Sequence, residues 1–182
     1  MTVAARLSQR PDAAVASLRY FDANGFGAAL REVTGTVLPG TGQAIRAAPA
    51  AAGSGECLLA WRSPSETLMV GNRALLAQVA ARTAASAHGY VVDQTGGISL
   101  LVVGGERGAL LLARLGSLGS RDCVPAPGEA RTGRLADLSV LTLCVRPLEW
   151  LLLVERVYAR HLRHWIQVTL DDDDLSEIHP HD

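Results

Sequence analysis

The sequence predicts an α+β protein built from two tandem, related β-α-β-β-α units that pack together. Three observations predict this class. Short apolar runs with strand-like composition alternate with amphipathic helical stretches. The order of these elements in the first half recurs in the second half after about 80 residues. The chain has 182 residues, of which 48% are hydrophobic, so it can bury a substantial core.

Corresponding segments of the two halves carry the repeat. The stretch "CLLAWRSPSETLMVGNRALLAQVAART", Cys57 to Thr83, contains an apolar run, a turn, a second apolar run and a helix. The stretch "SVLTLCVRPLEWLLLVERVYARHLRHWI", Ser139 to Ile166, repeats that order. Upstream of each, Ser17 to Pro39 and Ser99 to Ser120 predict a strand, a glycine-containing turn and a short helix. Each half is therefore expected to fold as a strand, a helix, a hairpin and a second helix.

Three further segments complete the expected layout. "GYVVDQTGG", Gly89 to Gly97, predicts a strand and a turn that join the halves. Ala44 to Glu56 is rich in Ala, Gly and Pro and has no period, which predicts a loop. The C-terminal segment begins with four consecutive aspartates and predicts an acidic flexible tail. We place the first unit at residues 1–97, the second at 98–170 and the tail at 171–182.

Charge and composition exclude several classes of protein. Seventeen basic and 18 acidic residues give a net charge of −1, so nucleic acid is not an expected partner. All the basic residues are arginines, which excludes a P-loop or Schiff-base lysine. We expect no signal peptide, no membrane span and a cytoplasmic location, because long apolar runs are missing. Cys57, Cys123 and Cys144 are far apart, which favours reduced, mostly buried thiols.

The stretch "LLVVGGERGALLLARLG", Leu100 to Gly116, has the strand, turn and helix order of a dinucleotide-binding unit. The fingerprint of that unit is G-x-G-x-x-G, whereas the glycines here are Gly104, Gly105 and Gly108, with the wrong first spacing. The first half has the same order of elements without any such motif. We predict a structural turn in which Gly104 and Gly105 reverse the chain, although a helix N-terminus can still attract an anion.

No self-contained catalytic, cofactor-binding or metal-binding set is expected in this chain. Asp93 ends a predicted strand and is the best candidate acid or base, but such a residue most often closes a turn. Arginine forks near a strand start suit carboxylate or phosphate partners. His161 and His164 share a helix face but have no third ligand nearby. Six residues remain as candidates for a ligand or subunit contact: Asp93, Arg131, Thr132, Arg134, Arg156 and His164.

Four motifs, taken in order, carry a resemblance to a known family. They are an apolar run leading into P-x-E-x-L, a V-D-Q-[ST]-x-G turn, an ART segment, and an R-x-x-A-x-x-L-x-x-W helix near the end. Together, from about Ser17 to Ile166, they resemble the γ subunit of heterotetrameric sarcosine oxidase. The resemblance implies a ferredoxin-like fold similar to one portion of the folate-binding aminomethyltransferase (T-protein) group.

The same resemblance implies a function. It implies a cytoplasmic complex that demethylates sarcosine to glycine with FAD, FMN and NAD, while tetrahydrofolate accepts the one-carbon unit. The cofactors are expected in other subunits, with none in this chain. This chain is then a non-catalytic partner that docks chiefly on the large α subunit, without nucleic acid or membrane. The N-methyl amine oxidised and the docking face stay open.

Two other functions compete with this one. A free-standing folate-binding or one-carbon-transfer protein of aminomethyltransferase-like fold would use Asp93 together with Arg131 and Arg134. A homodimeric interaction module would use exposed sheet or helix faces. The sequence does not choose between a monomer and a dimer for the isolated chain.

Overall fold

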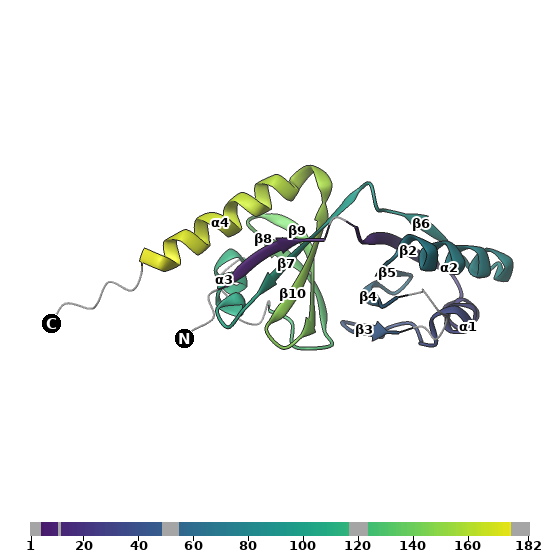
Figure 1. The fold of residues 1–182 in the computed structure, drawn as a ribbon. Helices are drawn as coiled ribbons and strands as arrows, with labels where there is room; N and C mark the ends of the chain where they lie inside the picture. Colours follow the sequence, from purple (N-terminus) through teal and green to yellow (C-terminus); the bar gives the residue numbers. More distant parts are fainter. Residues whose placement is uncertain (1–4, 11, 49–54, 117–123, 176–182) are drawn as a thin grey trace.

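Two five-stranded antiparallel sheets pack face to face, and a pair of helices covers the outer face of each sheet (Figure 1). The computed structural model describes residues 5–10, 12–48, 55–116 and 124–175, with side chains to Asp172. The layers follow the order helices, sheet, sheet, helices (Figure 1). This arrangement confirms the predicted α+β class with two packed units.

The first sheet belongs to the first half of the chain. Its strand order is β3-β4-β5-β2-β6. The strands are β2 (Ala14–Tyr20), β3 (Ala44–Ala47), β4 (Cys57–Ser63), β5 (Glu66–Gly71) and β6 (Gly89–Asp93). The helices on its outer face are α1 (Ala23–Thr34) and α2 (Arg73–Ser86).

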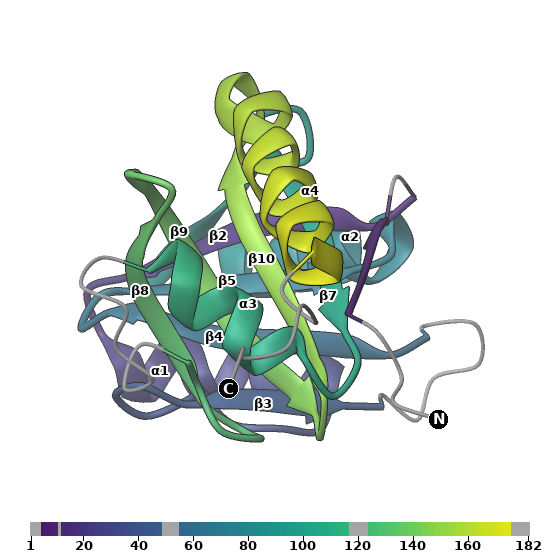
Figure 2. The same ribbon diagram turned by 90° about the vertical axis from the view of Figure 1, so that its left-hand side faces the viewer.

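The second sheet has the matching order β8-β9-β10-β7-β1. Its strands are β1 (Arg6–Gln9), β7 (Ile98–Gly104), β8 (Ala130–Leu135), β9 (Leu138–Arg146) and β10 (Glu149–Glu155). Its helices are α3 (Gly108–Leu115) and α4 (Ala159–Leu175), and the 3-10 turn η3 (Arg156–Tyr158) precedes α4. Figure 2 shows α3 and α4 lying across the outer face of this sheet.

Local sequence sets the ends of the first-half helices. Asp22 is the N-cap of α1, and its carboxylate accepts hydrogen bonds from the N–H groups of Asn24 and Gly25. The same helix ends at Gly35, whose φ of 71° is easily adopted only by a residue without a Cβ. Asn72 caps α2 by accepting from the N–H of Leu75 at 2.8 Å. These caps turn the chain sharply between strand and helix.

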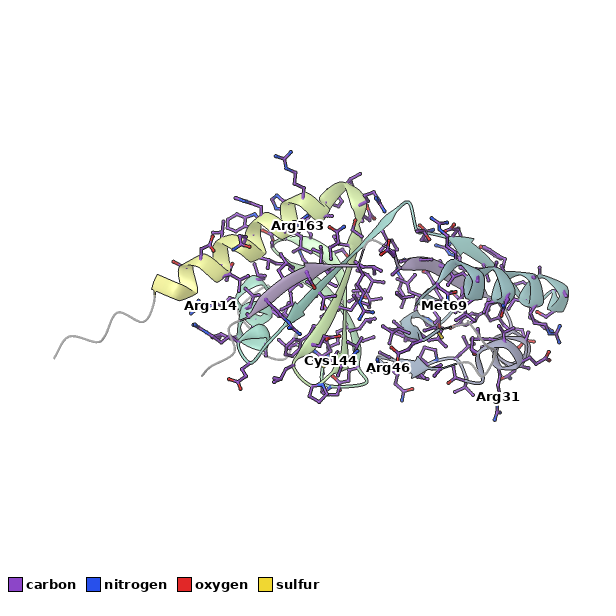
Figure 3. All side chains as sticks on the ribbon, viewed as in Figure 1. Arg31, Arg46, Met69, Arg114, Cys144 and Arg163 are labelled. Atoms are coloured by element: carbon purple, nitrogen blue, oxygen red, sulfur yellow. The ribbon has the colours of Figure 1, made fainter. Side chains whose placement is uncertain are left out.

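Strand periodicity divides the core into three clusters. Alternate side chains of each strand point to opposite faces, so Val15 packs between the sheets while Ala14 and Ala16 face the helices. Leu143 and Leu153 meet Val15 in the cluster between the sheets. Figure 3 shows side chains filling both this layer and the two sheet–helix layers. The molecule is therefore one sandwich held by a shared central layer.

Three features differ from the expected layout. Ala44–Ala47, part of the expected loop, forms β3 at the edge of the first sheet. Arg6–Gln9 forms β1, which pairs with β7 and so belongs to the second sheet, although we assigned residues 1–97 to the first unit. Helix α4 continues to Leu175, into the segment that we expected to be a flexible tail. The rest of that tail, residues 176–182, lies outside the described residues.

Cys57 and Cys144 are buried free thiols, and Cys123 lies outside the described residues. Burial raises the pKa of the Cys57 thiol to about 11, and the nearby Glu56 carboxylate adds to the increase. Burial also raises the pKa of Cys144. Within the described part of the chain, no helix is both long and apolar enough to span a membrane.

Candidate functional site

The glycine-rich turn between β7 and α3 is built for packing. Gly105 has a φ of 105°, and its N–H donates to the carbonyl of Leu148 at 3.0 Å. The N–H of Gly108 donates to the carbonyl of Gly105. A Cβ added to Gly108 would lie 2.7 Å from the ring of Trp150, so this glycine lets the helix approach the sheet. The turn uses these two N–H groups internally, so neither of them is available to a bound phosphate.

The structure brings two of the six candidate residues to one place. Asp93 ends β6, and one of its carboxylate oxygens accepts from the N–H of Thr95 at 2.8 Å. Arg156, at the start of η3, donates to the carbonyl of Thr95 at 2.9 Å, and its backbone N–H donates to Gly97 at 2.7 Å. The turn between the two sheets is thus held by a carboxylate on one side and a guanidinium on the other.

The other four candidates lie elsewhere. Arg131, Thr132 and Arg134 are exposed on β8, the edge strand of the second sheet. Arg131 pairs with Glu129 at 2.9 Å, and the guanidinium of Arg134 donates to the backbone carbonyl of Asp137 at 2.6 Å. His164 is exposed on α4. The arginines of β8 and His164 therefore do not share a site with Asp93.

Asp93 is suited to holding a cation. Hydrogen bonds from Thr95 lower its pKa, and the positive charge of Arg73 contributes to the decrease. A carboxylate with a lowered pKa is a poor proton acceptor at neutral pH, which disfavours the role of a general base. One oxygen is held by the turn, and the other lies 3.9 Å from the guanidinium of Arg73. The two side chains are 66% and 75% exposed, so both charges are open to solvent.

A hollow of about 290 Å³ adjoins this ion pair, between α2 and the outer face of β2 and β6. We call it the α2 pocket. Ala14 and Ala16 form its floor, Leu76 and Ala80 of α2 form a wall, and Arg73 and Asp93 lie at its rim. Sequence reasoning selected Asp93 alone.

A larger hollow of about 470 Å³ lies where β1, β4 and β5 meet. Its rim carries Arg10, Asp12 and Glu56, so opposite charges are close together. Arg10 also reaches Glu149 at 3.9 Å, which links the rim to the second sheet. Residue 11, between Arg10 and Asp12 in the sequence, and residues 49–54, which precede Gly55, are outside the described part of the chain. We therefore assign no ligand to it.

Exposed apolar side chains gather on η3 and α4. The exposed fractions are 78% for Val157, 45% for Trp165 and 41% for Val168. The rings of His161 and His164 meet Trp165 edge-on, with centroids 6.3 and 6.2 Å away. We define the α4 surface as Val157, Tyr158, His161, Trp165 and Val168. Among the described residues, no group of three or more His, Cys, Asp or Glu side chains could hold a metal ion.

The fold and the site define a two-unit α+β sandwich with an ion pair beside an apolar pocket. No protein-family model matches the chain, and no curated protein matches its sequence. A chain of heterotetrameric sarcosine oxidase from Corynebacterium sp. U-96, in complex with pyrrole 2-carboxylate, has a similar structure. Its TM-score is 0.80 at 24% identity, and the match covers 96% of this chain and 88% of that chain.

The glycine cleavage system aminomethyltransferase T from Bartonella henselae is also similar. The TM-score is 0.68 at 14% identity, and the match covers 91% of this chain but only 46% of that chain. This chain therefore corresponds to about half of the aminomethyltransferase. The predicted resemblance to sarcosine oxidase and to the aminomethyltransferase fold is confirmed by these two structures, at the level of fold.

Proposed function

We propose that this chain is the γ-type, non-catalytic subunit of a cytoplasmic heterotetrameric sarcosine oxidase complex and that it docks on the large flavoprotein chain. The observation that carries the proposal is the match to a chain of such an oxidase along nearly the full length of both chains. The sequence motifs from Ser17 to Ile166 support the same family.

The α4 surface supports association with another chain. Large apolar side chains that stay exposed on a folded monomer commonly mark an interaction site. Tryptophan is also enriched among the residues that contribute most to binding at protein interfaces. In this proposal the flavins, NAD and tetrahydrofolate are held by the other subunits.

Co-expression with the large flavoprotein chain of the same genome tests the proposal. A tag on this chain should recover the yellow partner in constant stoichiometry, and the recovered complex should oxidise N-methylglycine. Recovery of this chain alone, under conditions in which the large chain is folded and flavin-loaded, would contradict the proposal. A tagged unrelated protein of similar size serves as the control for non-specific capture.

A free-standing folate-binding protein is the second candidate function, because the aminomethyltransferase shares the fold. It predicts heat and thermal stabilisation when tetrahydrofolate is added to the isolated chain. Arg131→Ala should then weaken the binding, whereas Arg62→Ala, an exposed arginine of the first sheet, should not. No heat and no stabilisation at millimolar tetrahydrofolate would exclude this candidate.

A further inference from the structure

The α2 pocket is lined by small residues at positions where the second half carries larger ones. Strands β5 and β10 both begin with a glutamate, so their residues can be matched by position. The fourth residue of β5 pairs with a residue of β2, and the fourth residue of β10 pairs with a residue of β7. In the first half this pair is Met69 with Ala16. In the second half it is Leu152 with Leu101. Ala16 and Leu101 therefore hold equivalent positions, and the first lacks three carbon atoms that the second has.

The rim of the pocket differs in the same way. Asp93 pairs with Ala16 on β2, and Gln9 pairs with Leu101 on β7, so Asp93 and Gln9 are equivalent. In the second half the guanidinium of Arg163 on α4 donates to the side chain of Gln9 at 3.4 Å, next to the position that Leu101 occupies. The first arginine of α2 is Arg73, and the first arginine of the η3–α4 segment is Arg156. Ala80 lies seven residues after Arg73, just as Arg163 lies seven residues after Arg156, so Ala80 corresponds to Arg163. The pocket is open because no long side chain covers it.

The rim carries one charge of each sign. The guanidinium of Arg73 and one carboxylate oxygen of Asp93 are 3.9 Å apart, which is too long for a direct hydrogen bond. A ligand with an anionic and a cationic group can bind between them and satisfy both. Below the rim, the side chains of Ala14, Ala16 and Leu76 are apolar. The pocket is also lined by Thr95, whose hydroxyl is bonded to the backbone of Val15. A charged group placed there would lose hydration that the apolar side chains cannot replace.

We propose that the α2 pocket binds a small aliphatic α-amino acid, with its carboxylate on Arg73, its ammonium group on Asp93 and its side chain on the alanine floor. The hollow of about 290 Å³ accepts one such molecule. An aliphatic side chain of three or four carbons replaces the atoms that Leu101 supplies in the second half. The binding site goes beyond the proposed subunit function and does not depend on it.

Titration of the ¹⁵N-labelled full chain with leucine tests the proposal. The backbone signals of Asp93 and Thr95 should shift and saturate at millimolar leucine. Glycine, which has both charges but no side chain, should bind at least tenfold more weakly. Leucinamide, without the carboxylate, and 4-methylpentanoate, without the ammonium group, should each bind at least tenfold more weakly than leucine. Binding of 4-methylpentanoate or of 3-methylbutanol as tightly as leucine would show a purely apolar site and overturn the proposal.

Two substitutions fill the pocket from opposite sides. Ala16→Leu copies the second half, and Ala80→Leu fills the pocket from α2 should the first variant not fold. Either folded variant should lose at least tenfold in leucine affinity. Ala81→Leu, an equal addition on the exposed face of α2, is the matched control and should bind like the original chain. Unchanged leucine affinity in a folded pocket-filling variant would overturn the proposal. It would also be overturned if the original chain showed no signal shift with leucine above ~1 mM and in 50-fold molar excess over the protein.

A failure of this site and a failure of the subunit proposal are distinguishable. Leucine binding is measured on the isolated chain, whereas the subunit role is measured by recovery of the large flavoprotein. A chain that recovers its partner but does not bind leucine contradicts only the pocket. A chain that binds leucine but recovers no partner contradicts only the subunit role.

Discussion

The two halves of the molecule share one topology and use it differently. Each sheet has the same strand order, and each carries two helices on its outer face. In the first half a hollow adjoins α2, and Ala16 is among the residues that line it. In the second half Leu101 fills that space, and the apolar excess appears on the outside of α4, around Trp165. A topology therefore fixes where an opening can form, and side-chain volume decides whether it does.

The largest expected effect comes from placing in the second half the small residue that the first half has at the equivalent position. Leu101→Ala removes a fully buried side chain beneath α4 and should lower the free energy of unfolding by about 2–5 kcal/mol. Urea unfolding followed by circular dichroism and by tryptophan fluorescence measures the loss. A loss under about 1 kcal/mol would mean that the second sheet closes over the gap and that the contrast between the halves does not depend on this residue.

The α4 surface gives the second test. Trp165→Ser should weaken binding to the large flavoprotein chain at least tenfold, because truncating a central tryptophan commonly costs more than 2 kcal/mol of binding free energy. The free energy of unfolding of the Trp165→Ser variant should change by less than about 0.5 kcal/mol, as expected for an exposed position. Titration of the large chain, followed by biolayer interferometry, measures the affinity.

Phe21→Ser is the matched control for that variant. Phe21 is an aromatic residue of the first half and is 79% exposed, so the two substitutions remove similar exposed rings. Binding should stay unchanged in the control. Equal losses in both variants, or no loss in either, would contradict the assignment of docking to the second half.

The alkylation rates of the two buried thiols report how often each sheet opens, because Cys57 lies in the first sheet and Cys144 in the second. With a pKa of about 11, roughly one Cys57 side chain in a thousand is ionised at pH 8, so alkylation waits for the sheet to open. Cys144, near the end of β9, should be alkylated sooner than Cys57 on β4. Mass spectrometry of peptides after timed iodoacetamide treatment, in a Cys123→Ser background, separates the two rates. Equal rates in the folded chain would indicate that both sheets open together; denaturant should equalise them in any case.

The smallest effect concerns the pairing of α1 with α2. The guanidinium of Arg82 donates to both carboxylate oxygens of Glu32, at 2.6 and 2.8 Å, and these hydrogen bonds lower the pKa of Glu32. A carboxyl group with a lower pKa in the folded state stabilises the fold above its unfolded pKa, and this contribution is lost as the pH falls through the folded value. Glu32→Gln should therefore lower the urea midpoint slightly at pH 7.

The difference between Glu32→Gln and the original chain should vanish in acid, where Glu32 is protonated in both states. Urea midpoints measured from neutral to acid pH show whether it does. Glu155→Gln, at an exposed glutamate of the second half, is the control and should leave the midpoint curve unchanged. A constant difference at all pH values would mean that the substitution acts through packing and not through charge.

Much of the fold could be predicted because its signals are local. The caps at Asp22 and Asn72, the hairpin turns and the apolar runs of β4, β5, β9 and β10 lie within short windows of sequence. Strands β1 and β3 could not be predicted in this way. Each has four residues and mostly exposed or half-exposed side chains, so no alternation of apolar and polar residues marks it. Their pairing is decided by partners distant in the chain.

The candidate site was only partly predictable for a related reason. The turn at Asp93 has a local signature and is found where we expected it. The pocket beside it depends on what Ala16 lacks, and that becomes visible only when the registers of β2 with β5 and of β7 with β10 are known. Arg73 was missed because an arginine at a helix start is ordinary. Aligning the two halves residue by residue is the signal that could have found both.

Strand β1 gives the chain a definite order of assembly. During synthesis the first sheet has all of its strands once β6 has been made. Strand β1 is made first, but its partner β7 is made only after β6, so β1 cannot form its sheet pairing until then. A single cut between β6 and β7 cannot yield two complete halves, because the N-terminal fragment keeps a strand that the C-terminal fragment needs. Fragments cut there should regain the native sheet only when mixed, with β1 crossing from one piece to the other.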